Sequence, residues 1–567
     1  MTGLPSIDKP WQKYYPAQAI DSPLPKCKIF DYVYEKNRDN LDHNAINYYG
    51  RKYTYRQMFE IIEKTTSAFA TLGIREGDIL SICSFTTPET IFAFYAANRL
   101  GAIVNIIEPR TNSSLILERI NQTNSKVLII IDSFWGKISP VIKELTVLKI
   151  IVVGISDSMP MSKRLLYRWK SKNSVSCLSP KVIRWEHLIR SASCEPIIAP
   201  YRPGSPFAII YTSGTTGIAK GAVFSDDCLT ALEQACPVGN PRIYEGDTFL
   251  NIMPPFVAYG MFFGLFFVFC AKHENIIIPY CPPEHFVKVF LKYKPNHAVG
   301  VPMHWELLSR EKKSAANALS HLLCAIAGGD KLDVQTEIKI NQFFHSHGCM
   351  FDLQKGYGMT EMCSAATFTQ CEENNELGSV GIPLCKNSVM IVDAGTDHEL
   401  SYHKKGEICL SGPSMMIEYY QMPDETAQTI WTHKDGTKWI HTGDIGYINE
   451  NGVLFIADRL KRIIVRPDGH NVWPSKIESV LNSHPAIKVS AVVGLKAENS
   501  TSGRIPTAFI VTEDGIKQDD SLIKEIEEFT KQYLPERDTA TAYRFINSLP
   551  LTNVGKVDYL TLEKENR

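Results

Sequence analysis

The residues with the clearest potential for chemistry form a loop rich in glycine and hydroxyl side chains. The segment from Ala208 to Gly221 reads AIIYTSGTTGIAKG, an apolar strand-like run followed by Ser, Thr and Gly and then by Lys220. Glycine lets backbone N–H groups turn toward a polyanion, hydroxyls add donors, and lysine adds a positive charge. The spacing from Gly217 to Lys220 does not fit the P-loop pattern, and the dinucleotide fingerprint is absent. The loop is a candidate phosphate cradle, although an ordinary polar turn has the same composition.

Six further motifs follow this loop along the chain. They are GGDKL (328–332), GYGMTE (356–361), GEICLSG (406–412), HTGDIG (441–446), DRLKR (458–462) and PLTNVGK, which ends at Lys556. Together and in this order, the loop and these motifs resemble the adenylate-forming superfamily, which includes acyl-CoA synthetases, adenylation domains of peptide synthetases and firefly-type luciferases. The resemblance spans nearly the whole chain. It implies an AMP-forming ligase that uses ATP, Mg²⁺ and coenzyme A.

The resemblance assigns an ATP site. It implies that the loop holds the β- and γ-phosphates through Thr212, Ser213, Gly214, Thr215, Thr216, Gly217 and Lys220. It places Tyr357 beside the adenine ring, and Asp444 and Arg459 at the ribose, where a carboxylate can accept hydrogen bonds from both hydroxyls. Further ATP-binding positions carried over from the family are Gly329, Asp330 and Gly358.

The expected catalytic residues are Thr360, Glu361 and Lys556. The reaction brings a carboxylate against the α-phosphate of ATP, so two anions must meet and pyrophosphate must leave. The barrier is therefore one of charge and position. By resemblance, Thr360 contacts the α-phosphate, Glu361 binds Mg²⁺, and Lys556 places a positive charge between the two anions. Outside their motifs, a lone glutamate or a lone lysine near the end of a chain is more often simply solvated.

The elements that must position these residues read as α/β layers. Short β-branched runs, among them 127–131, 150–153, 207–211 and 274–278, alternate with helix-like segments such as 55–70 and 284–293. This alternation indicates largely parallel sheets covered by helices. No repeat of 20 to 50 residues is present.

The pattern changes near Arg459. Helix-like segments at 475–483 and 520–533 enclose strand-like runs at 489–494 and 507–512, which is typical of a small α+β domain. We expect a large N-terminal AMP-binding domain (1–459) and a small mobile C-terminal domain (462–567), with the hinge near Lys461. The resemblance implies that the small domain rotates after adenylation and brings the loop Arg466–Pro474 to the site, where Gly469 lets the backbone approach a pantetheine arm.

The chain departs from the family pattern in three ways. The loop RPDGHNVWP is one residue longer than the family's, which makes the thioester-forming step less secure than adenylation. In MPPFVAYG, Val257 stands where the family often has histidine, or aspartate in amino-acid activators, so an amino-acid substrate is disfavoured because its buried ammonium group would have no partner. No carrier domain follows Lys556, so we expect the acceptor thiol to come from another molecule.

The acid is expected to be fatty or otherwise apolar. Phe256 to Phe269 (FVAYGMFFGLFFVF) is apolar on all sides and would suit either an acyl pocket or a buried core helix. We expect Phe256, Val257 and Gly328 to line the acyl pocket, with Gly469 at the thiol tunnel. The start KPWQKYYP also resembles long-chain fatty acyl-CoA synthetases over a short stretch.

Composition excludes several classes of protein. The chain has 567 residues, and 60 Lys and Arg nearly balance 61 Asp and Glu, which gives no support for nucleic-acid binding. The 14 cysteines form no C-x-x-C pair, which fits a reducing cytoplasm. The N-terminus has no signal-peptide core, and the apolar run 261–271 is too short to span a bilayer.

These observations leave three readings. An acyl-CoA synthetase comes first, and an acyl-AMP ligase that loads a free-standing carrier protein comes second. A non-catalytic nucleotide-binding protein on the same fold comes last, because binding alone would not need Lys556.

Overall fold

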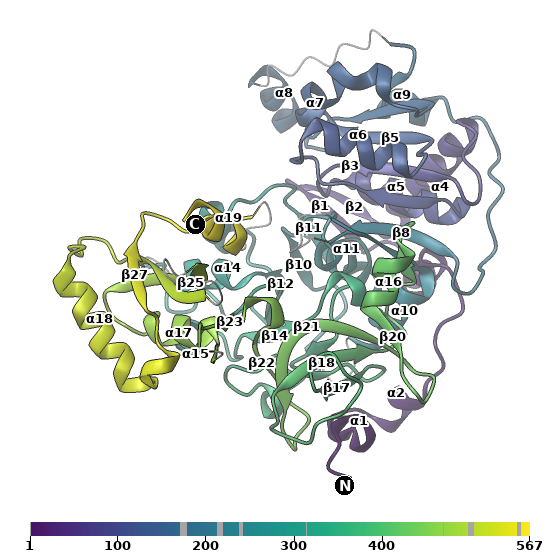
Figure 1. Cartoon of the computed structure of the whole chain (residues 1–567). Helices are drawn as coiled ribbons and strands as arrows, with labels where there is room; N and C mark the ends of the chain where they lie inside the picture. Colours follow the sequence, from purple (N-terminus) through teal and green to yellow (C-terminus); the bar gives the residue numbers. More distant parts are fainter. Residues whose placement is uncertain are drawn as a thin grey trace.

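The computed structural model describes residues 2–170, 179–212, 219–236, 242–312, 315–468, 470–496, 504–552 and 557–566. Within these residues, two large mixed sheets, a third antiparallel sheet and their helices make up most of the molecule (Figure 1). A small C-terminal sheet with its own helices lies to one side, drawn in yellow. The mixed α/β class that we expected, with a large N-terminal and a small C-terminal part, is confirmed.

The first sheet has nine strands among the described residues, in the order β16-β15-β14-β13-β12-β10-β11-β1-β2. Pairing from β14 through β1 is parallel, and antiparallel strands lie only at the two edges. The strands are β1 (Asn44–Tyr48), β2 (Arg51–Thr54), β10 (Thr248–Asn251), β11 (Glu274–Ile277), β12 (His297–Gly300), β13 (Cys324–Ala327), β14 (Gln354–Tyr357), β15 (Thr367–Phe368) and β16 (Ile382–Pro383).

The second sheet has eight strands in the described residues, in the order β19-β9-β8-β4-β3-β5-β6-β7. It is parallel from β8 to β7, as the β-branched runs predicted. The strands are β3 (Ile79–Cys83), β4 (Ile103–Ile106), β5 (Val127–Ile131), β6 (Lys149–Val153), β7 (Val182–Arg184), β8 (Pro206–Tyr211), β9 (Gly221–Ser225) and β19 (Glu418–Tyr419).

Helix α5 (Pro88–Leu100) is buried along almost its whole length. Its sequence, PETIFAFYAANRL, is apolar on most sides, as expected for a helix enclosed by other elements. The Thr87 side chain caps its start by accepting from the Thr90 N–H, and Gly101 ends it in the left-handed conformation, at φ 72°. The helix packs against β4 and α4 (Tyr55–Thr71), so the core is continuous from the second sheet to its covering helices.

The remaining helices of the larger part cover the sheets and their edges. They are α1 (Pro5–Asp8), α2 (Ala17–Asp21), α3 (Ile29–Asn37), α6 (Ser113–Gln122), α7 (Trp135–Ile138), α8 (Met161–Lys170), α9 (Trp185–Arg190), α10 (Asp226–Ala235), α13 (Pro283–Tyr293), α14 (Pro302–Ser309), α15 (Val334–Ser346) and α16 (Pro423–Thr429).

The third sheet departs from the largely parallel arrangement that we expected. It is antiparallel throughout and consists of β17 (Ser388–Val392), β18 (Gly406–Ser411), β20 (Ile430–Thr432), β21 (Lys438–Ile448) and β22 (Leu454–Arg459). Its strands follow one another with few intervening helices, which is the arrangement that favours antiparallel pairing. Two of the sequence motifs, GEICLSG and HTGDIG, lie on neighbouring strands of this sheet.

The aromatic segment after Phe256 is a buried helix. It runs through α11 (Ala258–Met261), the π-helical turn η4 (Phe262–Phe267) and α12 (Val268–Cys270). A Cβ built on Gly264 would clash with the Asn251 side chain of β10. A larger residue at this position would therefore push the helix away from β10. Among the described residues, no helix is long and apolar enough to cross a membrane.

The C-terminal part contains β25 (Ile487–Lys496) and β26 (Arg504–Thr512) as an antiparallel pair, with β27 (Ala542–Phe545) parallel to β26. A short hairpin of β23 (Ile464–Val465) and β24 (Asn471–Val472) precedes them. The helices are α17 (Pro474–Leu481), α18 (Asp520–Tyr533) and α19 (Tyr559–Glu565). The domain boundary at Lys461 stays a prediction; the residue is exposed in a single turn, η7 (Leu460–Arg462), between β22 and β23.

Candidate active site

A cavity of about 420 Å³ opens at the carboxyl ends of the parallel strands of both large sheets. Its walls include residues that directly follow strands, among them Phe85 after β3, Thr212 after β8 and Met253 after β10. Ligands of open α/β sheets bind at this edge, because the strand ends leave a crevice there. The cavity is therefore the candidate active site.

Eight of the residues singled out in the sequence line this cavity. They come from four separate segments of the chain and are Thr212, Phe256, Val257, Gly328, Gly329, Tyr357, Gly358 and Thr360. The structure therefore brings the expected nucleotide residues and the expected acid-pocket residues to one space.

Two hydrogen bonds between Thr212 and Lys220 close the base of the phosphate loop. Thr212 N–H donates to the Lys220 carbonyl at 2.9 Å, and the Thr212 hydroxyl accepts from the Lys220 N–H at 3.2 Å. These bonds extend the antiparallel pair of β8 and β9 by one step. The predicted loop residues Ser213, Gly214, Thr215, Thr216 and Gly217 lie outside the described residues.

Asp444, the predicted ribose ligand, has a defined setting beside the cavity. The Tyr357 hydroxyl donates to Asp444 Oδ2 at 2.7 Å, and Arg459 Nε lies 2.9 Å from Asp444 Oδ1. Asp444 and Arg459 face each other in the register of β21 and β22, which explains why they meet. The Asp444 carboxylate raises the pKa of Arg459, and burial raises that of Tyr357, so the arginine stays charged and the phenol neutral.

Glu361 is buried in the short turn that follows Tyr357, with 8% of its surface exposed. The Tyr419 hydroxyl donates to its carboxylate. Lys220 lies over the ring of the same tyrosine, with Nζ 4.7 Å from the centroid, and forms an ion pair with Glu425 of α16 at 2.6 Å. Tyr419 thus links the predicted metal ligand to the lysine of the phosphate loop.

Gly358 is required by the close approach of two backbone segments. A Cβ built on this residue would lie 1.7 Å from the Ser364 carbonyl oxygen. Gly329 has φ 80°, a conformation that favours glycine. Both glycines line the cavity, so their identity follows from the shape that the chain must take there.

Part of the cavity wall is mostly apolar. Phe256, Val257 and Tyr259 meet Phe85 and Phe263 there, and Phe85 packs against Phe256 at a ring distance of 5.9 Å. This wall comes from the start of the buried helix, whereas the residues beyond Phe263 belong to the core. The aromatic segment therefore serves as both pocket lining and core.

Charged side chains stand at one side of this apolar wall. Arg110 Nε lies 2.7 Å from Glu108 Oε1, and the guanidinium is 5.5 Å from the centre of the Phe256 ring. Arg119 is buried and stacks on Tyr211 at 4.1 Å. Burial lowers the pKa of Arg119 and raises that of Tyr211 to about 12, so the phenol is neutral at physiological pH.

Six described residues of the predicted site do not line the cavity: Lys220, Glu361, Asp444 and Arg459, whose contacts are given above, and Asp330 and Lys461. Asp330 is exposed and its carboxylate accepts from the Lys331 N–H at 2.8 Å. Lys461 is exposed, and its charge helps to lower the pKa of Glu425 after the larger effect of Lys220. Gly469 and Lys556 lie outside the described residues. Their neighbours are described: Leu551 and Thr552 line the cavity, and Leu551 forms an antiparallel bridge with Val557.

The lengthened loop is bonded to its own part of the chain. The Arg466 guanidinium donates to the Thr539 carbonyl at 2.7 Å and to the Thr541 hydroxyl at 3.0 Å, and His470 Nε2 lies 2.6 Å from Asp538 Oδ1. The residues that set this loop apart from the family pattern thus tie it to the segment before β27.

Three participants were missed at the level of sequence. Tyr419 and Glu425 contact the predicted residues Glu361 and Lys220, and Glu407 supports the Asp444 turn by accepting from the Gly443 N–H at 2.9 Å. Glu407 lies in a motif that we recognised, so its partner could have been sought in the sequence. Tyr419 and Glu425 stand in no recognised motif, and no local signal marks them.

Comparison with known proteins agrees with this site. Residues 33–420 match the family model described as AMP-binding enzyme, and residues 476–556 match the AMP-binding enzyme C-terminal domain. The chain belongs to the adenylate-forming superfamily of AMP-binding enzymes. It is an adenylate-forming ligase, and membership of the family supports binding of ATP.

The relatives of this ligase align with most of its length. It is 27% identical over 557 residues to a long-chain-fatty-acid–CoA ligase of Bacillus subtilis, covering 97% of this chain and 96% of the relative. It is 28% identical over 514 residues to a 4-coumarate–CoA ligase of Vanilla planifolia, covering 89% and 87%. Its fold matches ATP-bound MatB from Rhodopseudomonas palustris with a TM-score of 0.82 at 22% identity, covering 95% and 99% of the two chains.

Proposed function

We propose that this ligase activates an apolar carboxylic acid with ATP and transfers the acyl group to the thiol of coenzyme A, releasing AMP and pyrophosphate. The observation that carries the proposal is that one cavity is lined both by Tyr357 and Thr360 and by apolar residues that include Phe256 and Val257. An acid bound against these apolar residues would direct its carboxylate toward the nucleotide residues. The full-length similarity to acid–CoA ligases supports the same assignment.

In the first half-reaction, a carboxylate oxygen bonds to the α-phosphorus of ATP, and the bond from that phosphorus to pyrophosphate breaks. We assign the ribose to Asp444, which already accepts a hydrogen bond from Tyr357 and pairs with Arg459. Thr360, at the cavity wall, donates to the α-phosphate. Fixed donors of this kind lower the barrier by stabilising charge as it develops.

Glu361 is suited to hold Mg²⁺. Its carboxylate is buried and, within the described part of the chain, forms no ion pair; the hydroxyl of Tyr419 is its side-chain partner. A carboxylate that pairs with no basic side chain can serve as an oxygen ligand to a hard cation. When bound there, Mg²⁺ would neutralise charge on the phosphates. Tyr419 orients the carboxylate toward the site.

We assign the mobile positive charge to Lys556. The bridge between Leu551 and Val557 brackets the segment that contains this lysine, and Leu551 and Thr552 line the cavity. These contacts support a position of Lys556 at the cavity during adenylation. The expected contribution of such a charge is about 10²–10³ in rate, by analogy with the loss of one oxyanion-hole donor.

In the second half-reaction, the thiolate attacks the acyl carbonyl carbon and AMP leaves. The small domain would first rotate about Lys461, withdraw Lys556 and bring the loop with Gly469 to the site. Lys461 is exposed beside the buried Asp458, whose carboxylate accepts from the Ser475 N–H at 2.9 Å and so holds α17 against β22. No disulfide joins the cysteines that the structure describes, and disulfides are rare in a reducing cytoplasm, the compartment that we propose for this enzyme.

The acid is best described as apolar, either fatty or aromatic. Val257 is half-buried in the wall and provides no charge to pair with an α-ammonium group, which disfavours amino acids. Phe85, Tyr259 and Phe263 offer aromatic surface on which either an aryl ring or an alkyl chain would pack. Relatives named for long-chain fatty acids and for 4-coumarate are equally compatible with this wall.

The test is pyrophosphate release from purified full-length protein with ATP, Mg²⁺ and a panel of acids from acetate to palmitate together with aryl acids. Each acid is run with and without coenzyme A. Release that depends on one class of apolar acid and rises to steady turnover with coenzyme A is expected. Turnover indifferent to coenzyme A would favour a carrier-protein ligase, and no release with any acid would contradict the proposal.

A further inference from the structure

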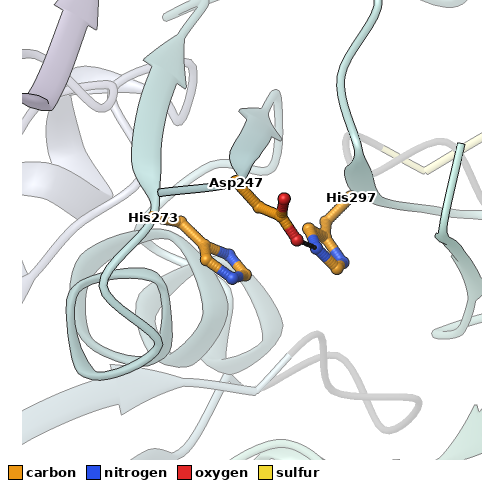
Figure 2. A group of neighbouring side chains, drawn as sticks. All are labelled: Asp247, His273 and His297. Atoms are coloured by element: carbon orange, nitrogen blue, oxygen red, sulfur yellow. Dashed lines mark hydrogen bonds and ion pairs between the residues drawn. The ribbon is translucent and has the colours of Figure 1, made fainter. Parts of the chain in front are cut away.

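Three potential metal ligands meet at the edge of the nine-stranded sheet that lies opposite the cavity (Figure 2). Asp247 precedes β10, His273 precedes β11, and His297 begins β12. Since β10 pairs in parallel with both neighbours, the starts of the three strands share one edge. The cavity residues Met253 and Val301 follow the other ends of β10 and β12, so this cluster is separate from the active site.

The three side chains lie close together. Asp247 Oδ2 lies 2.7 Å from His297 Nε2, and the rings of His273 and His297 stack with centroids 4.5 Å apart and an interplanar angle of 15°. One ligand atom from each residue lies within 4.8 Å of the other two. The strands β11 and β12 flank β10 and are therefore about 9.5 Å apart, so the two imidazoles reach toward each other across the start of β10.

His273 is anomalous for a buried side chain. Its exposed fraction is 0%, and within the described residues neither ring nitrogen makes a well-formed hydrogen bond, apart from a marginal contact with the backbone of Tyr244. Buried polar groups are almost always paired, so an unpaired one needs an explanation. Burial and the nearby His297 lower the pKa of His273 far below its usual value, which keeps the ring in the neutral form that binds metals.

The charge around the cluster also leaves room for a cation. Among the described residues, Asp247 pairs with no lysine or arginine; its charged-group partner is His297. The nearest basic residue in sequence to His273, Lys272, forms an ion pair with Glu245 at 3.0 Å. The Asp247 side chain is 16% exposed, which gives an ion a path from solvent.

We propose that Asp247, His273 and His297 bind a divalent transition-metal ion of the zinc type, which clamps together the starts of β10, β11 and β12. Two imidazoles and one carboxylate suit Zn²⁺ and its neighbours better than Mg²⁺ or Ca²⁺, which prefer oxygen ligands. Ligand atoms around tetrahedral zinc lie about 3.4 Å apart, so modest rotations of the three side chains close the site, and a water molecule takes the fourth position.

The experiment uses full-length protein, freed of metal with a chelator and kept reduced. Zn²⁺ is titrated against a chromophoric competitor, and Co²⁺ is titrated separately while its visible spectrum is recorded. The variants are His273→Leu, Asp247→Asn and the control His285→Leu, which alters an exposed histidine on α13. Asp247→Asn keeps the shape of the side chain, and circular dichroism is recorded to check that the variant folds. A loss of metal binding by a folded variant is then not a folding defect.

The wild type and His285→Leu are expected to bind one equivalent of Zn²⁺, with a tetrahedral Co²⁺ spectrum that lacks a thiolate charge-transfer band. Asp247→Asn and His273→Leu are expected to weaken Zn²⁺ binding by more than about 100-fold, since loss of even a supporting partner costs 10- to 100-fold. The proposal is wrong if the wild type binds no ion, or if both variants bind as well as the wild type. It is also wrong if the bound Co²⁺ shows a thiolate band, which would place the ion on a cysteine, as at Glu407, Cys409 and His441, and not at Asp247.

Discussion

The two sides of the cavity are built on different principles. On the nucleotide side, charged groups hold one another: Asp444 contacts Arg459, and Lys220 contacts Glu425. On the acid side, Phe256 and Val257 belong to an apolar wall that continues into the core. Whichever acid is activated, the nucleotide is always ATP. The nucleotide side therefore needs a fixed set of donors and charges. The acid side needs only an apolar pocket of suitable shape, and many different sets of apolar side chains can form such a pocket.

This difference has a consequence for binding. If the proposed assignment holds, the ion pairs on the nucleotide side open or share their partners when ATP binds. The Lys220–Glu425 pair is partly exposed, with side chains 19% and 38% accessible, and pairs of this kind contribute little stability. Its lysine can therefore be released to the phosphates at low cost. The apolar wall has no such pairs to open, so it acts through burial of the acid alone.

The largest effect is expected from Lys556→Ala. This change removes a positive charge near the reacting carboxylate and phosphate and should slow acid-dependent pyrophosphate release by about 10²–10³ with little change in the KM for the acid. Lys564→Ala, on the exposed face of α19, is the matched control and should retain normal activity. Equal rates for the two variants would remove Lys556 from the nucleotide side.

Much of the fold was predictable because it is local. The runs at 127–131 and 520–533 are β5 and α18 with the predicted bounds, since β-branched runs and amphipathic periods act over a few residues. The antiparallel sheet of β17, β18 and β20–β22 was not predicted, because strand pairing depends on distant partners. β27 was missed for a related reason. Its four residues are only partly buried, and they form a strand because they pair with β26.

The site divides in the same way. Tyr357, Thr360 and Asp444 were expected at the site from their motifs; Tyr357 and Thr360 line the cavity and Asp444 contacts Tyr357, while their roles toward ATP stay predictions. Tyr419 could not be expected there, because its contact with Glu361 arises only when β19 pairs with β9, far away in the chain. Asp247, His273 and His297 also lack a spacing pattern, since each simply starts or precedes a strand and the parallel sheet brings them together.

Asp444→Asn should weaken the binding of ATP and leave the binding of the acid unchanged. The change keeps the shape of the side chain but removes the charge that pairs with Arg459 and would bind the ribose. Hydrogen bonds to charged groups are worth about 1.5–3 kcal/mol, so the KM for ATP should rise about 10- to 100-fold. The KM for the acid should stay the same.

Steady-state kinetics with each substrate varied in turn checks this expectation. Asp435→Asn, in the exposed turn before β21, is the control and should leave both constants unaltered. If the KM for the acid rises as much as the KM for ATP, the two sides are not independent.

Val257→Asp makes the converse test. A carboxylate in the apolar wall must either lose solvation or repel the acid's own charge, so the KM for an apolar acid should rise about 5- to 30-fold, from the 1–2 kcal/mol end of the cost of a buried polar group. The KM for ATP should not change. Val465→Asp alters a valine that is 48% exposed on β23 and should be silent. An increase in the KM for ATP alone would place Val257 on the nucleotide side.

The smallest effect is expected from Tyr419→Phe, which removes one hydroxyl and keeps the ring. Glu361 then loses its orienting donor, while Lys220 keeps the aromatic face beneath it. The carboxylate remains to bind the metal and only its orientation is lost, so we expect a loss of about 0.5–1.5 kcal/mol, less than a full hydrogen bond to a charged group. Adenylation should therefore slow about 2- to 10-fold, with a higher Mg²⁺ concentration needed for half-maximal rate. Tyr420→Phe, next in the chain, changes a hydroxyl whose side-chain contact is Gln421 at 3.5 Å and should leave the Mg²⁺ dependence unaltered. A shift of equal size in both variants would mean that the effect comes from β19 as a whole and that Tyr419 does not orient the metal ligand.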